Sequence, residues 1–319
     1  DLGRIEGYRN FCNKLWNATR YVLQNTEGED CTAGSPTLAD RWIIARLQQV
    51  SGDIDGHIEN YRFDLVARDL YEFVWNDYCD WYIELSKPVL YSDTFGLEAK
   101  QAARHTLINV LEAILRLLHP IMPFITEELW QRVAPVAGVE AVTIMRCRYP
   151  QSDPALIDAD AQDELEWVKS FIMGVRQIRS EMDIKPGKPV PVLCQHGSNT
   201  DQQRIERNRR LLQSLAKLES ITWLDTDAQA PQAATSLVGD MQQLIPLAGL
   251  IDKDAERARL QKNIDRLEQD GARLSAKLGN ENFVARAPRE VVDKEKEKLA
   301  DNESALASLR AQLQRIETI

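Results

Sequence analysis

The sequence has 319 residues, of which 44% are hydrophobic and 28% charged, a composition typical of an ordinary soluble globular protein of two or three domains. No apolar run approaches the roughly 20 residues that a membrane span needs, so a membrane partner is not expected. The net charge of −10 counts against nucleic-acid binding by the chain as a whole. Residues 252–319, however, hold equal numbers of basic and acidic residues. Whether the chain can bind nucleic acid therefore depends on local basic patches rather than on its net charge.

The cysteines are odd in number and scattered, and no two are spaced as C-x-x-C. They are Cys12, Cys31, Cys79, Cys147 and Cys194. This pattern argues against a disulfide framework and against a zinc site, and it favours a cytoplasmic location.

Helical periodicity predicts four long helices between residues 1 and 132. The first covers about residues 3–24, and its apolar face repeats at spacings of three and four: Ile5, Tyr8, Cys12, Leu15, Thr19 and Val22, with Phe11 and Ala18 alongside. The second follows the start signal Ser35-Pro36-Thr37. The third is rich in aromatic residues and runs from about Phe63 until Pro88 stops it. The fourth covers about 97–118 and resumes over 125–133. Short connections between them predict an antiparallel bundle.

Residues 143–150 are predicted to be extended, and 151–251 to form a small α/β domain. Helices are expected over 164–182 and 204–218, with strands at 220–224 and 244–246. Val190 to Leu193 is predicted to be an edge strand, because Pro191 cannot donate a hydrogen bond to an interior ladder.

The last segment predicts an antiparallel coiled-coil hairpin. One helix repeats Leu260, Ile264, Leu267, Leu274 and Leu278 with a gap at Gly271; the other repeats Val292, Leu299, Leu306, Leu309, Leu313 and Ile316, interrupted by Glu295 and Asn302. Gly279 suits a helix C-cap and Pro288 the first turn of the next helix. The predicted fold is therefore mainly α, with a helical bundle over 1–150, a small α/β domain over 151–251 and a C-terminal coiled-coil hairpin over 252–319.

No catalytic residues, metal site or cofactor are predicted in this chain. Neither a G-x-x-x-x-G-K nor a G-x-G-x-x-G string occurs, and the four histidines lie far apart without metal-ligand spacing. His105 and His119 are interpreted as structural. The acids Asp69, Glu72, Asp77, Asp80 and Glu84 are interpreted as a solvated helix face rather than acid/base pairs.

The first helix carries a local basic patch in an acidic chain. Away from its apolar face it presents Arg9, Asn10, Asn13, Lys14, Asn17 and Arg20, with Trp16 at the border. Cations that meet phosphates, amides that read base edges and an aromatic ring that stacks are the means of single-stranded RNA recognition. The alternative is a solvated face whose asparagines hydrogen-bond neighbouring helices.

The hairpin allows two interpretations as well. Its candidate RNA-binding residues are Arg273, Lys277, Phe283, Arg286 and Arg289. Basic residues along it could hold a phosphate backbone. Acids match bases one for one, however, and interspersed charge is usual on the outside of a coiled coil, so the pattern alone favours a plain coiled coil.

Six strings, in order along the chain, resemble valyl-tRNA synthetases. They are R-N-F-C-N-K-L-W-N at 9–17, D-R-W-I at 40–43, R-F-D at 62–64, Y-E-F-V-W-N-D-Y-C-D-W-Y at 71–82, H-P-I-M-P-F-I-T-E-E-L-W at 119–130 and N-F-V-A-R-A-P at 282–288. The bundle strings are partly shared with the isoleucyl, leucyl and methionyl relatives. The C-terminal coiled coil, without a cysteine zinc module, points to the valine enzyme.

The resemblance implies that the bundle is an anticodon-binding domain and that the hairpin leans on the outer corner of tRNA(Val). It further implies that the chain binds tRNA rather than DNA. A closed intramolecular hairpin predicts a monomer, whereas an exposed seam would predict self-association. The whole enzyme, a class I synthetase, would use ATP and Mg to charge tRNA. This chain shows no His-Ile-Gly-His or Lys-Met-Ser-Lys-Ser type of string and no editing domain, so we expect it to be inactive alone. The competing hypothesis is a structural module of bundle and coiled coil that binds no RNA.

Overall fold

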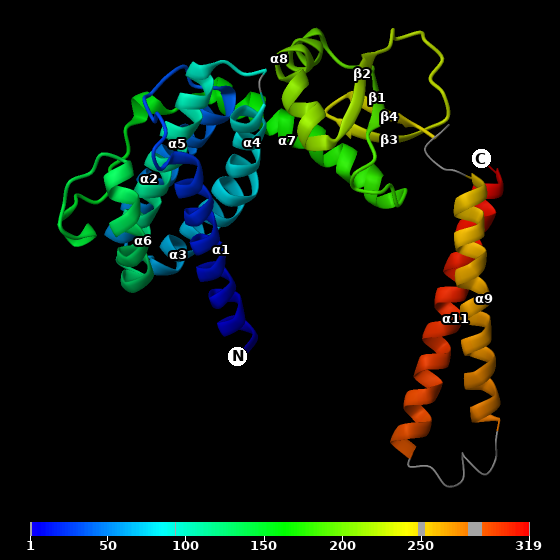
Figure 1. Cartoon of the computed structure of the whole chain (residues 1–319). Helices are drawn as coiled ribbons and strands as arrows, with labels where there is room; N and C mark the ends of the chain where they lie inside the picture. Colours follow the sequence, from blue (N-terminus) through cyan, green and yellow to red (C-terminus); the bar gives the residue numbers. More distant parts are fainter. Residues whose placement is uncertain (1, 93, 248–252, 280–288, 319) are drawn as a thin grey trace. The chain divides into compact units, whose positions relative to one another are not determined.

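The computed structural model describes residues 2–92, 94–247, 253–279 and 289–318 (Figure 1). The chain divides into two compact units, Asp1–Thr226 with Ser236–Gln243, and Asp227–Thr235 with Leu244–Ile319. Among the described residues no helix is long and apolar enough to cross a membrane. The division into 1–150, 151–251 and 252–319 remains a prediction.

The first unit begins with a helical bundle, which confirms the predicted fold class. Its elements are α1 (Leu2–Thr26), α2 (Leu38–Glu59), α3 (Phe63–Glu72), the π-helical segment η1 (Phe73–Tyr82), α4 (Ile83–Tyr91), α5 (Leu97–Leu118) and α6 (Pro123–Val136). The core of the bundle contains fully buried aromatic side chains, among them Trp42, Tyr78 and Trp130. Thr37 and Asp40 form a capping box that starts α2.

Three local predictions about these helices are wrong. Pro88 does not stop the third helix, which continues as α4 to Tyr91 with the proline inside it. Tyr8 is 66% exposed rather than part of the core. The segment at 143–150 is not wholly extended, because Ile144–Arg146 forms a turn of 3-10 helix after Thr143 caps it.

The bundle continues into a small α/β part. A short 3-10 turn (Pro154–Leu156) leads into α7 (Ala159–Glu181), which is followed by β1 (Val190–Gln195), α8 (Asn199–Ala216), β2 (Leu218–Trp223), β3 (Ala233–Val238) and β4 (Met241–Pro246). The strands form one sheet in the order β2-β1-β4-β3. Strand β3 was not predicted.

β1 is an interior strand, so its prediction as an edge strand is wrong. It pairs in parallel with β2, from Val190 opposite Leu218 to Cys194 opposite Trp223, and has β4 on its other side. The register shifts between Val190 and Pro191. This irregularity accommodates a residue that has no N–H to donate.

The second unit contains the predicted coiled coil. Figure 1 shows α9 (Lys253–Leu278) and α11 (Arg289–Thr318) side by side and running in opposite directions. Leu260, Ile264 and Val292 are buried along the seam. The irregular seam positions face one another, since a Cβ on Gly271 would lie 2.9 Å from Asn302 Oδ1.

Candidate nucleic-acid interface

Helix α1 separates its side chains into two faces. Phe11, Leu15, Ala18 and Val22 are buried against the bundle. The predicted RNA-facing residues are exposed, except for Lys14, which is half-buried: Arg9, Asn10, Asn13, Trp16, Asn17 and Arg20. Spacings of three and four place Arg9, Asn13, Trp16 and Arg20 along one side of the helix.

The asparagines do not hydrogen-bond neighbouring helices within the described part of the chain. There, Asn10, Asn13, Asn17 and Arg20 have neither a hydrogen-bond nor an ion-pair partner. Trp16 is 46% exposed. Their donors and the indole face are therefore available to a ligand.

The two remaining cations of the patch differ in their surroundings. Arg9 pairs with Glu6 at 3.0 Å, and both side chains are about two-thirds exposed, so this ion pair contributes little and leaves Arg9 able to change partner. The ammonium of Lys14, in contrast, lies 2.5 Å from Asp80 Oδ1 and 3.8 Å from the centre of the Trp75 ring. Lys14 is thus engaged within the protein rather than presented to solvent.

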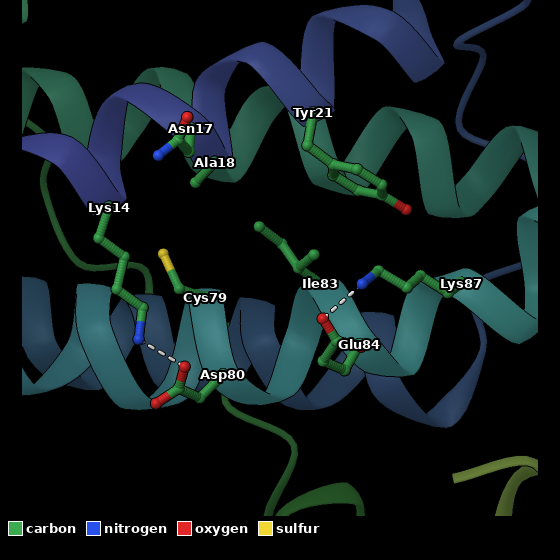
Figure 2. A pocket seen from close by; sticks show the side chains of 9 residues that line it. All are labelled: Lys14, Asn17, Ala18, Tyr21, Cys79, Asp80, Ile83, Glu84 and Lys87. Atoms are coloured by element: carbon green, nitrogen blue, oxygen red, sulfur yellow. Dashed lines mark hydrogen bonds and ion pairs between the residues drawn. The ribbon is translucent and has the colours of Figure 1, made fainter. Parts of the chain in front are cut away.

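An open pocket of about 480 Å³ lies beside this face of α1 (Figure 2). Three elements line it: α1 with Lys14, Asn17, Ala18 and Tyr21, η1 with Cys79 and Asp80, and α4 with Ile83, Glu84 and Lys87. Two ion pairs, Lys14–Asp80 and Lys87–Glu84, each measure 2.5 Å. Ala18 and Ile83 give the pocket a small apolar wall, and the two ion pairs give it a charged rim.

The pocket offers recognition groups rather than a nucleophile. Burial raises the pKa of the Cys79 thiol to about 12, so the sulfur stays protonated. Asn17 supplies an amide, Glu84 supplies an acceptor, and the Tyr21 ring supplies an aromatic surface with Lys87 5.6 Å from its centre, whereas the Asp80 carboxylate is engaged by Lys14. These groups suit the edge and face of an unstacked nucleotide base.

The acids of the third predicted helix are not simply a solvated face. Asp77 accepts from Arg46 at 3.1 Å and lies 3.9 Å from Lys169. Asp69 lies 3.0 Å from His57 Nε2. Both carboxylates are mostly buried, so the interpretation as a solvated face is wrong for them. They tie neighbouring helices together.

His105 and His119 have structural partners, as predicted. His105 Nδ1 lies 2.9 Å from the carbonyl oxygen of Cys31, and His119 Nδ1 lies 2.7 Å from Thr126 Oγ1. Within the described residues, no group of three or more His, Cys, Asp or Glu side chains could hold a metal ion.

The arm residues of the candidate set lie in different surroundings. Arg273 is 81% exposed, with Asp270 at 3.9 Å. Lys277 pairs with Glu295 at 3.2 Å. Phe283 and Arg286 lie outside the described residues. Arg289 begins α11, but its side chain is outside the described part as well.

The sequence did not predict the pocket residues contributed by η1 and α4. From the sequence, Asp80 and Glu84 are interpreted only as acids on a helix face, and no role is predicted for Tyr21 and Lys87. The spacing of Glu84 and Lys87, three residues apart on a helix, indicates an ion pair on one face. Only the packing of α1 against η1 and α4 brings them beside Asn17.

Two comparisons define the class of protein. Residues 40–194 match the anticodon-binding domain of tRNA ligase. This segment includes most of the bundle together with α7 and β1, and it begins after α1. Residues 40–194 are therefore an anticodon-binding domain of the tRNA ligase class.

Residues 252–317 match the tRNA-binding arm of valyl-tRNA synthetase and coincide with the coiled coil. The chain therefore carries two tRNA-binding domains, an anticodon-binding domain of tRNA ligases and the tRNA-binding arm of valyl-tRNA synthetase, as in the C-terminal region of that ligase. The prediction of a tRNA-binding function is confirmed, against the alternative of a structural module. The individual RNA-contacting residues remain predictions.

Proposed function

We propose that this chain recognises tRNA(Val) at two places for ATP-dependent aminoacylation by a parent valine-tRNA ligase. The bundle takes the anticodon stem-loop on the exposed face of α1 and in the adjoining pocket. The arm contacts the outer corner of the tRNA. The observation that carries the first contact is the row of exposed polar side chains on α1, Asn13, Asn17 and Arg20, which have no partner within the described residues.

The division of labour on α1 follows from chemistry. Arg9 and Arg20 are suited to phosphates, which position the RNA without reading its sequence. Asn13 and Asn17 present an amide donor and acceptor, which can discriminate base edges, and Trp16 is available for stacking. The pocket lies directly beside Asn17 and accommodates a base that leaves the loop stack.

Binding of a labelled anticodon stem-loop tests this assignment. We expect Arg9→Ala to weaken the tRNA(Val) stem-loop and an unrelated stem-loop alike, and to flatten the salt dependence of binding. We expect Asn13→Ala to reduce the preference for the tRNA(Val) stem-loop. Unchanged binding by both variants would show that the assignment is wrong.

Arg132 offers a matched control. Its side chain is 67% exposed and pairs with Glu27 at 3.1 Å, close to the 66% and 3.0 Å of the Arg9–Glu6 pair. Arg132→Ala removes the same charge from helix α6. It should leave stem-loop binding within experimental error of the unsubstituted chain.

The arm is proposed to raise the effective concentration of RNA at the bundle by adding a second contact. Deleting residues 252–319 should weaken full-length tRNA(Val) and barely change an isolated anticodon stem-loop. Equal losses for both RNAs would mean that the arm only supports the bundle. No loss for either RNA would mean that the arm is a plain coiled coil.

The chemistry is proposed to reside elsewhere in the parent enzyme, which would act in the cytoplasm with ATP and Mg. The chain itself is proposed to hold no cofactor and to lack aminoacylation, ATP-pyrophosphate exchange and editing activity. Valine-dependent exchange above a contaminant control would contradict this. We also propose that the chain is a monomer, because the two helices of its own hairpin bury each other's apolar seam and leave none for a second chain. Sedimentation at two concentrations tests this proposal.

A further inference from the structure

The segment η1 is a π-helix, a conformation that is rare and is concentrated at functional sites. Its wider turn is closed by hydrogen bonds between residues five apart, as at its end, where the Ile83 N–H donates to the Tyr78 carbonyl oxygen. Side chains five apart therefore lie roughly one above the other. In an α-helix the same two positions would point about 140° apart, from 3.6 residues per turn.

Trp75 and Asp80 use this spacing. They are five residues apart on η1, and both contact the ammonium of Lys14, the ring at 3.8 Å from its centre and the carboxylate at 2.5 Å. A partly buried cation over an indole ring and beside a carboxylate is held by two attractions at once. The π-helical register is what allows one lysine to receive both.

Trp75 also ends a row of stacked rings that starts on α1. Phe11 stacks on Tyr71 with ring centres 5.2 Å apart, and Tyr71 stacks on Trp75 at 5.5 Å. Because Phe11 and Lys14 are three residues apart on α1, the contacts form a closed circuit from α1 to η1 and back. A circuit that holds two neighbouring positions of one helix fixes the rotation of that helix about its axis.

We infer that Lys14 is a positioning residue for tRNA recognition and makes no direct contact with phosphate. Its charge is used within the protein, and its side chain is only 23% exposed. Together with Trp75 and Asp80 it sets the angle at which α1 presents Asn13 and Asn17. This inference rests on the proposed function of the α1 face.

Substitution of Asp80 distinguishes a positioning role of Lys14 from a purely electrostatic one. If Lys14 only added positive potential, Asp80→Asn would remove an opposing negative charge and tighten RNA binding. If Lys14 orients α1, Asp80→Asn loosens the ammonium and weakens binding. The two explanations therefore predict opposite signs for the same substitution.

The experiment measures stem-loop affinity at several salt concentrations for Lys14→Met, Lys14→Arg, Asp80→Asn and the double variant Lys14→Met/Asp80→Asn. We expect Lys14→Met and Asp80→Asn each to weaken binding, roughly 3- to 10-fold, with an unchanged slope of log K against log salt. The double variant, which has the original net charge, should bind no better than Lys14→Met. Lys14→Arg should restore most of the affinity.

Arg20→Ala is the reference for a phosphate contact and should reduce the salt slope by about 0.7–0.9. A similar reduction by Lys14→Met, tighter binding by Asp80→Asn, or recovery in the double variant would overturn the inference. So would unchanged binding by Lys14→Met when Asn13→Ala and Arg20→Ala still weaken it. If Asn13→Ala and Arg20→Ala also have no effect, the proposed function fails instead. Far-ultraviolet circular dichroism confirms that each variant is folded; Asp80 is half exposed, so losing Lys14 does not strand a buried charge.

Discussion

The buried carboxylate of Glu112 is a sensitive point of the bundle. It lies on α5 and is 3% exposed. Trp130 Nε1 of α6 donates to its Oε1 at 2.8 Å, and Arg116 donates to its Oε2 through Nε at 2.9 Å and Nη2 at 2.7 Å. Arg116 also donates through Nη1 to the Arg148 carbonyl oxygen at 2.8 Å. Two partners thus satisfy one buried charge.

Removing the two members of this ion pair should have unequal costs. Arg116→Met leaves a buried carboxylate without its cation, which costs about 3–5 kcal/mol. Glu112→Gln keeps an acceptor for Trp130 and leaves Arg116, which is 25% exposed, able to turn towards water. Its cost is that of a hydrogen bond to a charged group, about 1.5–3 kcal/mol. For a unit of this size the shifts in Tm are roughly 6–20 °C and 3–12 °C.

Urea unfolding followed by circular dichroism and tryptophan fluorescence measures both costs. Arg207→Met is the control, because Arg207 pairs with Glu164 at 2.9 Å but is 57% exposed, and its loss should cost less than about 1 kcal/mol. The reasoning is refuted if Glu112→Gln destabilises the unit more than Arg116→Met does. It is equally refuted if Arg116→Met costs no more than the control.

Three further predictions concern the arm and the pocket. In the arm, hydrogen bonds from Lys298 and Lys277 lower the pKa of Glu295 below its usual 4.5. The ionised carboxylate therefore stabilises the arm above that pH, and this stabilisation is lost as the pH falls. In thermal melts, the stability difference between the unsubstituted chain and Glu295→Gln should shrink below about pH 4.5. Gly271→Ala and Gly271→Ala/Asn302→Ala both gain about 1 kcal/mol of helix propensity. The double variant should have the higher melting temperature, because Asn302→Ala removes the side-chain oxygen that a Cβ at position 271 would meet at 2.9 Å, an oxygen that is buried without a hydrogen-bond partner among the described residues. In the pocket, Cys79 should resist iodoacetamide at pH 8, because a pKa of about 12 leaves roughly one thiolate in 10,000; rapid labelling of Cys79 in the folded chain, detected by peptide mass spectrometry, would contradict its burial.

The helices were predictable because the helical spacing of their apolar residues lies within one continuous segment of the sequence. Leu97–Leu118 was predicted as found, since its apolar positions repeat without interruption. Pro88 misled because a proline ends a helix only when nothing else holds the following turn. Here Val89 and Leu90, which follow it, are buried in the bundle, and that burial outweighs the lost hydrogen bond.

Strand order was not predictable from local pattern. Pro191 indicated an edge, yet the register shift beside it lets β1 occupy the interior of the sheet. β3 (Ala233–Val238) escaped detection because Ala233, Ala234 and Thr235 lack the strong alternation of a half-buried strand. Both errors have the same cause, since a strand is specified by neighbours far away in the sequence.

One part of the candidate site could likewise be predicted from local sequence, and the other could not. The polar face of α1 could be predicted because charge and helical spacing within one segment define it. The pocket could not, because it joins residues of α1 to residues of η1 and α4 that are more than 55 positions away. The engagement of Lys14 was further hidden by the π-helix: a reader who assumes 3.6 residues per turn puts Trp75 and Asp80 on different sides of the helix. Lys14 therefore looked equivalent to Arg9 and Arg20 in the sequence, whereas the two contacts that distinguish it exist only in the wider turn of η1.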